Sequence, residues 1–313
     1  MSYVNIEDKD GRYYFVKDGQ LLEPSYDYIY QTEYNYLVCL RGKWGCANWQ
    51  GKITVPIEYD YIHYPYRDFI VASKGPNSYG VVKNDGTPLT KFVYDAILVE
   101  NEQDGIVPVF KKYQKKLYGF IDISTGIEIS KPSFESIDKF FNGYCSVFKN
   151  GKWGAINRKG NLVVPFKYLT SFRFFDDFAI VWERERLYIE EDSVSRLILK
   201  SSCKVIYKNG TEILKRFDGI KRIGPATYRT IEEIKGIAHY HTYQLIVKPR
   251  YIVVIKDAAY MDILLDNPTT DYEQCENAKY LDGGTWYAID FYGNKINLDQ
   301  SVFKQIRNEL TNK

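Results

Sequence analysis

One pattern that occurs more than once limits what the chain can fold into more than any other feature. Residues 41–56 read RGKWGCANWQGKITVP, and residues 150–165 read NGKWGAINRKGNLVVP. Each copy is followed by a tyrosine, Tyr59 in the first and Tyr168 in the second. Such self-similarity is the signature of a repeat protein, in which one unit cannot bury its own apolar face and stacks on its neighbours.

Weaker copies of the same unit occupy the rest of the sequence. The aromatic residue of the Trp-Gly position recurs in steps of 31, 35, 39 and 35 residues, as Tyr13, Trp44, Tyr79, Tyr118 and Trp153. We therefore expect five recognisable units in residues 1–170. Residues 171–313 are expected to hold degenerate units with insertions, of which one has Cys203 at the aromatic position and the last lies near residues 284–297.

Each unit reads as a short antiparallel β-meander. In the unit around Trp153, residues 144–148 form an apolar strand, and Asn150-Gly151 is a strong signal for a tight hairpin turn. The second strand carries the Trp-Gly pair. The third strand ends at Pro165, which cannot donate a hydrogen bond to a strand ladder. The sequence therefore predicts three- to four-stranded meanders in tandem.

The glycine that follows the key aromatic residue indicates that another group approaches the backbone there. We expect the aromatic side chain of one unit to pack over the glycine of a neighbouring unit. The alternative use of Trp44 and Trp153 is as platforms on which a ligand stacks, although burial is the commoner fate of a tryptophan.

These units resemble the WG-repeat (WG-containing β-repeat) family of bacterial proteins. The resemblance is carried by Trp44-Gly45 and Trp153-Gly154, is good over residues 10–170 and is patchy beyond them. It implies a non-enzymatic interaction module without a common set of catalytic residues. The expected fold is all-β, with tandem antiparallel meanders in an open curved β-solenoid or a propeller-like array. A short helix at about residues 300–311 is expected to close it, because Val302, Ile306 and Leu310 form one apolar stripe.

Charge and composition exclude several classes of function. The chain has 42 Lys+Arg against 40 Asp+Glu, so its formal charge of +2 predicts no nucleic-acid partner. No stretch approaches the roughly 20 apolar residues that span a bilayer, and the first residues lack a secretory signal, so we expect a cytoplasmic protein without a membrane partner. Five cysteines, an odd count at irregular spacing, predict free thiols rather than disulfides.

No arrangement of residues predicts catalysis, a cofactor or a metal. His239 and His241 lack further ligands at a suitable spacing. Asp27, Asp60 and Asp95 recur with the repeat, so a turn or backbone-bonding role explains them better than a carboxylate pair does.

Tyrosine is the abnormal component, with 29 residues, and it suggests an interaction surface. The candidate partner-binding surface consists of aromatic and flanking residues from two crossings between units, Tyr28, Tyr30, Tyr34, Tyr61, His63, Tyr64, Tyr66 and Arg67. The same aromatic residues can instead join consecutive units. Residues 171–280 depart from the repeat and offer a second candidate surface.

The sequence favours a protein that binds another protein, one form being an inhibitor or immunity-type partner of a toxin or effector. The alternative is carbohydrate or small-ligand binding through exposed Tyr and Trp platforms. An enzyme with a site in the degenerate half has the least support.

Overall fold

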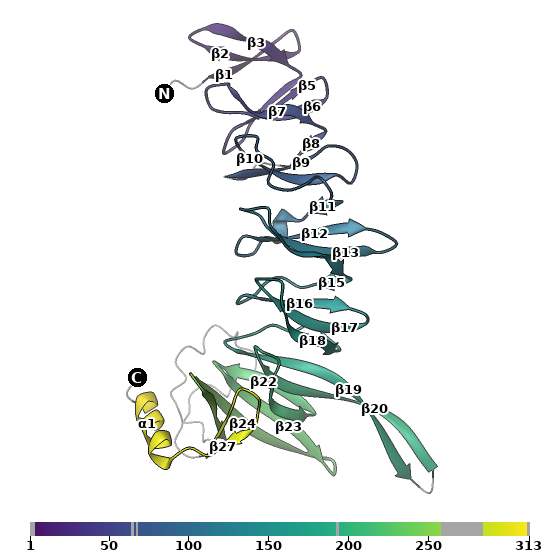
Figure 1. The fold of residues 1–313 in the computed structure, drawn as a ribbon, viewed down its shortest axis with the longest axis vertical. Helices are drawn as coiled ribbons and strands as arrows, with labels where there is room; N and C mark the ends of the chain where they lie inside the picture. Colours follow the sequence, from purple (N-terminus) through teal and green to yellow (C-terminus); the bar gives the residue numbers. More distant parts are fainter. Residues whose placement is uncertain (1–3, 64–65, 67, 192–193, 258–283, 312–313) are drawn as a thin grey trace. The chain divides into compact units, whose positions relative to one another are not determined.

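The computed structural model describes residues 4–63, 66, 68–191, 194–257 and 284–311. Over these residues the chain consists of antiparallel strands, one 3-10 turn, η1 (Val99–Asn101), and one α-helix, α1 (Gln300–Thr311) (Figure 1). The expected all-β repeat fold with a C-terminal helix is therefore confirmed. The chain divides into two compact units: unit 1 holds Met1–Phe140 with Arg158–Gly160, and unit 2 holds Phe141–Asn157 with Asn161–Lys313.

Unit 1 contains consecutive antiparallel meanders whose strands pair in sequence order. The first meander comprises β1 (Asn5–Lys9), β2 (Arg12–Lys17) and β3 (Gln20–Tyr26). The second comprises β4 (Tyr28–Gln31), β5 (Tyr36–Leu40), β6 (Lys43–Ala47) and β7 (Ile53–Tyr59). The third comprises β8 (Tyr61–Ile62), β9 (Phe69–Ser73) and β10 (Tyr79–Lys83). The fourth comprises β11 (Ala96–Ile97), β12 (Ile106–Lys112), β13 (Lys116–Asp122) and β14 (Glu128–Phe134), and β15 (Ser136–Ile137) follows it.

Unit 2 begins with a meander of the same type and then departs from it. Its regular strands are β16 (Tyr144–Lys149), β17 (Lys152–Asn157) and β18 (Leu162–Tyr168). The next sheet comprises β19 (Phe178–Glu191), β20 (Val194–Tyr207) and β21 (Glu212–Phe217). The last comprises β22 (Gly219–Gly224), β23 (Thr227–Ile234), β24 (Ile237–Lys248), β25 (Tyr251–Lys256), β26 (Thr285–Ile289) and β27 (Lys295–Ile296). Strands β19 and β20 have 14 residues each, so the departure from the repeat takes the form of long hairpins (Figure 1).

Helix α1 covers the last sheet of unit 2. Ile306 is buried against Val253 and Ile255 of β25, and Val302 and Leu310 pack around it. These are the side chains that the four-residue spacing placed on one face, since i and i+4 residues of a helix are neighbours. Helix α1 therefore closes the core at this end, as expected.

The Trp-Gly motif is explained by a bulge within one meander. Trp44 pairs with Tyr59 and Cys46 pairs with Val55, so β7 has two more residues than β6 between these pairs. A Cβ atom on Gly45 would lie 2.6 Å from the Val55 carbonyl oxygen and 2.9 Å from the Pro56 carbonyl oxygen. The group that approaches the glycine is thus β7, the last strand of its own meander. Our expectation of a neighbouring aromatic side chain was wrong.

Similar register shifts recur in other units, in strong and in weak copies of the motif. The register shifts by two residues between Tyr118 and Phe120 and between Trp153 and Ala155, and by one residue in the degenerate region between Cys203 and Val205. Cys203 pairs with Phe217, the position at which the other units pair their key aromatic residue. The structure therefore confirms Cys203 as the counterpart of the missing tryptophan.

Neighbouring meanders touch through the turn that follows the strand with the key aromatic position. In unit 1, a Cβ on Gly51 would lie 3.2 Å from the Phe15 ring, and one on Gly86 would lie 2.9 Å from the Thr54 carbonyl oxygen. In unit 2, a Cβ on Gly210 would lie 3.3 Å from the Val163 carbonyl oxygen. Each of these glycines has a positive φ, which only glycine adopts without strain. The turn therefore allows one meander to rest closely on the preceding one.

Candidate binding surface

The recurring aspartates support the hairpins of the meanders. Asp27 is paired with Arg12 and accepts a hydrogen bond from the Gly42 amide at 3.4 Å, and Asp95 accepts one from the Lys112 amide. Partial desolvation raises the pKa of Asp27, but the hydrogen bonds from the Arg12 side chain and from the Arg41 and Gly42 amides outweigh it and lower the pKa below its ordinary value. The expected backbone-bonding role is therefore confirmed for Asp27 and Asp95.

The key aromatic residues are half-buried, and each has an aromatic neighbour. Trp44 packs on one side against a cluster that includes Val55 and Tyr59, and its ring lies 6.0 Å from that of Tyr30. The Trp153 ring lies 5.2 Å from that of Phe148, its partner in β16, at an interplanar angle of 50°. These side chains thus contribute to the core and also leave part of the indole at the surface.

An aromatic row, consisting of Tyr13, Tyr28, Tyr30 and Trp44, runs across the first two meanders of unit 1. The ring centroids are 6.2 Å apart for Tyr13 and Tyr28, 6.1 Å for Tyr28 and Tyr30, and 6.0 Å for Tyr30 and Trp44. The last two pairs are nearly parallel, with interplanar angles of 13° and 19°. Tyr28 and Tyr30 are 49% and 53% exposed because alternate residues of β4 face outward, whereas Ile29 between them is buried.

The fixed charges beside the aromatic row largely cancel. Arg12 is paired with Asp27, and Lys43 is paired with Asp60. The row therefore offers aromatic area and tyrosine hydroxyl groups, without a strong net charge that would select an anionic partner.

The other residues of the expected surface lie in separate places. Tyr61 is exposed and contacts Tyr79 edge to face, with ring centroids 6.4 Å apart. His63 stacks on Tyr66 at 6.2 Å, and Tyr66 stacks on Phe69 at 4.9 Å. These two groups come from the third meander of unit 1.

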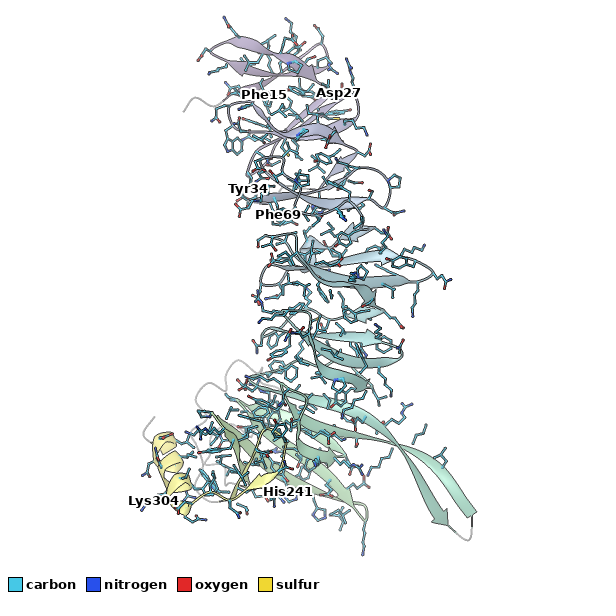
Figure 2. All side chains as sticks on the ribbon, in the orientation of Figure 1. Phe15, Asp27, Tyr34, Phe69, His241 and Lys304 are labelled. Atoms are coloured by element: carbon cyan, nitrogen blue, oxygen red, sulfur yellow. The ribbon has the colours of Figure 1, made fainter. Side chains whose placement is uncertain are left out.

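Tyr34 is half-buried in the turn between β4 and β5, where its amide donates to the Thr32 hydroxyl at 3.2 Å. Figure 2 shows Tyr34 and Asp27 at opposite edges of the strands. Tyr64 and Arg67 lie outside the described residues. Of the residues expected to form one surface, the structure stacks Tyr28 directly on Tyr30.

Tyr13 was missed as a surface residue, and for Trp44 we favoured packing over the alternative of a ligand platform, because of the place of both residues in the repeat. The signal that identifies them is the alternation in β4, which turns Tyr28 and Tyr30 toward the same face as the key aromatic residues. A further exposed group in unit 2 includes Ile237 and Tyr240 of the hairpin formed by β23 and β24, in the region expected to offer a second surface.

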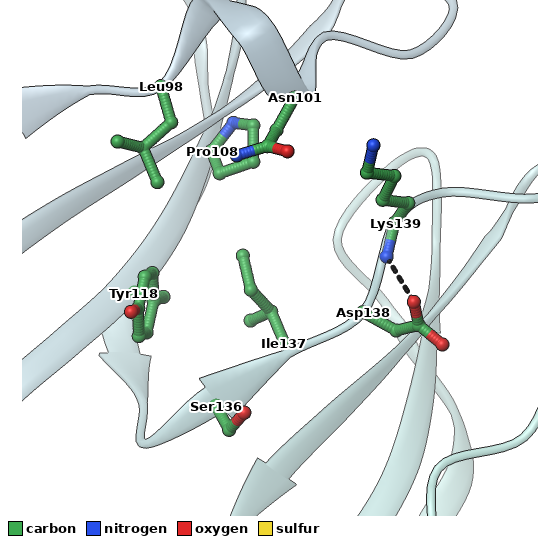
Figure 3. Close-up of a pocket in the computed structure, with 8 residues that line it drawn as sticks. All are labelled: Leu98, Asn101, Pro108, Tyr118, Ser136, Ile137, Asp138 and Lys139. Atoms are coloured by element: carbon green, nitrogen blue, oxygen red, sulfur yellow. Dashed lines mark hydrogen bonds between the residues drawn. The ribbon is translucent and has the colours of Figure 1, made fainter.

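A hollow of about 310 Å³ lies between the fourth meander of unit 1 and the segment that begins with β15 (Figure 3). Its residues come from η1 and the strands around it, and they are Leu98, Asn101, Pro108, Tyr118, Ser136, Ile137, Asp138 and Lys139. The lining includes both apolar and polar residues.

Among the described residues, no group of three His, Cys, Asp or Glu side chains is placed to hold a metal ion. His241 contacts Asp257 at 3.0 Å, and this pair has no third ligand within that part of the chain. None of the helices in the described ranges has the length and apolar character needed to cross a membrane.

The fold defines the class of the protein as a tandem β-meander repeat protein. Three segments, residues 44–75, 118–153 and 153–181, match the family described as the WG containing repeat. The chain therefore contains WG-type repeats in these segments. The matched segments include the Trp44 and Trp153 units and the Tyr118 unit, in which tyrosine replaces tryptophan. No curated protein matches the chain in sequence.

Several solved structures are similar over much of the chain at low identity. Hsv2p of Kluyveromyces lactis is 12% identical, with a TM-score of 0.28, and the alignment covers 78% of this chain and 89% of the Hsv2p chain. PorZ of Porphyromonas gingivalis is 9% identical, with a TM-score of 0.27 and coverages of 84% and 44%. The extracellular domain of BT4673 from B. thetaiotaomicron is 10% identical, with a TM-score of 0.25 and coverages of 95% and 53%. Likeness at this level carries no argument about function.

Proposed function

We propose that this WG-repeat chain is a non-enzymatic binding protein that holds another protein on the aromatic row of unit 1. The observation that supports the proposal is the outward stacking of Tyr28 and Tyr30 beside the half-buried Tyr13 and Trp44. Tyrosine and tryptophan are the side chains that most often dominate protein interfaces, because they offer a large rigid area at small entropic cost.

The packing of the row supports a binding role rather than a purely structural one. Tyr28 and Tyr30 stand on the face of β4 opposite Ile29, so the buried core of the meander is complete without them. If they served only to join units, they would be buried against a neighbouring meander. Their rings instead leave about half of their surface to solvent.

The test is affinity capture from native cell lysate with the tagged full-length chain, the Tyr28→Ala/Tyr30→Ala variant and a control. Tyr292→Ala is a matched control, because Tyr292 is 84% exposed and lies in unit 2. We expect one stoichiometric protein to be captured by the wild type and by the control but lost with the double variant. Capture that is equal with all three proteins would refute the assignment to the row.

The captured protein also decides the finer form of the function. A toxin or effector whose activity is suppressed by the chain would make it an inhibitor or immunity-type protein. All variants are compared by thermal unfolding, and the two tyrosine substitutions are expected to leave the unfolding temperature nearly unchanged because exposed residues contribute little to stability.

Carbohydrate binding on the same row is the second candidate, and the near-parallel rings at regular spacing support it. A flat aromatic strip can stack on the apolar faces of successive sugar units. Quenching or protection of the Trp44 fluorescence by oligosaccharides, together with an empty protein capture, would favour this candidate over the first.

A further inference from the structure

The hairpin of β23 and β24 extends beyond the rest of its sheet in unit 2 (Figure 1). The pairing of β22 with β23 ends at Ile231, and the pairing of β24 with β25 ends at Tyr243. Strands β23 and β24 pair with each other as far as Ile234 and Ile237. All residues from 231 to 240 are exposed. The end of the hairpin is therefore a two-stranded ribbon in solvent.

This ribbon is apolar for an exposed segment. The exposed fraction is 37% for Ile231, 46% for Ile234, 64% for Ile237 and 62% for Tyr240. Two-stranded ribbons on their own are only marginally stable in water. Strand edges that carry apolar side chains readily pair with a strand of another chain. The end of the hairpin therefore has the properties of an association site.

The outer edge of β24 has backbone groups available for such pairing. The Thr242 carbonyl accepts a hydrogen bond from the Asp257 amide at 2.8 Å, so this carbonyl points away from β23. Alternate residues of a strand direct their backbone groups to the same edge, so those of Tyr240 and Ala238 point the same way. Strand β25 ends at Lys256, and within the described part of the chain no strand pairs with Tyr240 or Ala238 on this side. The edge thus presents two N–H and two C=O groups.

The opposite edge of the hairpin is protected. The Glu233 amide of β23 donates to the Asp218 carboxylate at 2.8 Å, and this bond takes up a donor that an added strand would need. Natural proteins block exposed edges with such contacts, or with lysine or proline on the edge strand. Ala238 and Tyr240 provide no block of this kind on β24. Pairing is therefore possible along β24 and hindered along β23.

The positions of the unpaired groups are self-complementary. In an antiparallel pair, two opposite residues exchange both of their backbone hydrogen bonds. When Ala238 lies opposite Tyr240 of a second copy, two-fold symmetry places Tyr240 opposite Ala238 of that copy, and all four groups of each edge are bonded. We propose that β24 pairs edge to edge with β24 of a second copy of this chain, in the antiparallel register centred on His239.

The side chains on one face of the hairpin agree with this register. Ile231 is paired with Tyr240, and Glu233 is paired with Ala238, so these four side chains share a face. In the dimer, each Tyr240 lies beside Ala238 of the other copy, whose methyl group leaves room for the phenol ring. Glu233 of that copy is one strand further, about 4.8 Å beyond Ala238. The Tyr240 hydroxyl can therefore donate to this carboxylate across the small side chain.

Sedimentation velocity of the full-length chain from low to high micromolar concentration tests the association. We expect a reversible equilibrium of monomer and dimer, since a contact of this size is weak. Ala238→Pro removes the outward N–H without breaking a bond between β23 and β24, and it should abolish the dimer. Ala238→Ser is the matched control, because it keeps the N–H at nearly the same size, and it should associate like the wild type. Tyr240→Ala should weaken association on the order of tenfold, since the lost contact occurs twice in the dimer.

Cysteine cross-linking tests the register independently of those variants. In the dimer, residue 239 of each copy lies opposite its counterpart as a non-hydrogen-bonded pair, with Cα atoms about 4.5 Å apart, a distance that a disulfide can span. Glu232 lies opposite His239 within one chain, so both β24 strands separate the two copies of Glu232. With oxidised glutathione, His239→Cys should form a covalent dimer, and Glu232→Cys should remain at the level of the wild type.

Three results would each overturn the proposal. The first is a wild type that remains monomeric at every concentration, which would leave the edge to a different protein. The second is a dimer that persists in Ala238→Pro when thermal unfolding shows this variant to be folded. The third is cross-linking of Glu232→Cys as rapid as that of His239→Cys. The aromatic row lies in unit 1, so these outcomes are independent of the proposed protein binding.

Discussion

Gly45→Ala tests the physical reason for the Trp-Gly motif. The new methyl group would lie 2.6 Å from the Val55 carbonyl oxygen, 2.9 Å from that of Pro56 and 2.9 Å from Ile57 Cγ1. Two of these atoms belong to the bulged backbone of β7, which cannot move without disturbing its pairing with β6. Overpacking of this kind costs about 3 kcal/mol at the upper end of its usual range.

The net change in the free energy of unfolding also depends on the unfolded state. Alanine reduces the conformational freedom of the unfolded chain, which offsets about 0.4–1 kcal/mol of the cost. We therefore expect Gly45→Ala to lower the free energy of unfolding by about 2 kcal/mol. Urea unfolding followed by tryptophan fluorescence measures this change through the midpoint of the transition.

Gly219→Ala is the control. The nearest atoms to its Cβ belong to the Ile231 side chain, at 3.5 Å or more, and its φ is not in the left-handed region. This variant should be as stable as the wild type or slightly more so. If Gly45→Ala unfolds at the same urea concentration as Gly219→Ala, the third strand does not constrain the motif glycine and the explanation fails.

Two further predictions concern unit 2 and the thiols. Burial raises the pKa of Glu212, but hydrogen bonds from Lys204 and Lys167 outweigh it and lower the pKa below 4.5. The stability that Glu212 contributes is therefore present above pH 4.5 and is lost as the pH falls through the lowered pKa. In Glu212→Gln, the free energy of unfolding measured with urea should therefore depend less on pH at acidic pH. Burial also raises the pKa of Cys46 to about 12 and that of Cys203 to about 11. Both thiols should therefore react with a disulfide reagent only when the protein unfolds. Rapid labelling of either thiol in the native protein would contradict their burial.

Most of the fold was predictable because the same local signals occur in several copies of the repeat. Each copy contains the same turn signals, the same alternation of apolar residues and a similar spacing of the key aromatic residues. A sequence specifies one structure when its local signals agree in this way. The same logic identified Cys203, whose unit has no aromatic residue at the key position but keeps the Asn209-Gly210 turn. Helix α1 was predictable from its single apolar stripe.

The candidate sites were predictable only in part. The excess of tyrosine indicated an interaction surface, and Tyr28 and Tyr30 follow from alternation within one strand. Their combination with Tyr13 and Trp44 depends on contacts between different strands, which sequence spacing does not give. The long hairpins of unit 2 were not predicted either, although each of them pairs strands that are adjacent in the chain.

The sequence by itself determined the repeating meander, its turns and its closing helix, because these depend on residues close together in the chain. Only the tertiary structure decided what Gly45 approaches, since the bulge in β7 places carbonyl oxygens of Val55 and Pro56 over it. It also decided where the packing is loose. Ile137 occupies the same position in its unit as three buried isoleucines, and its exposure depends on the side chains around it in space.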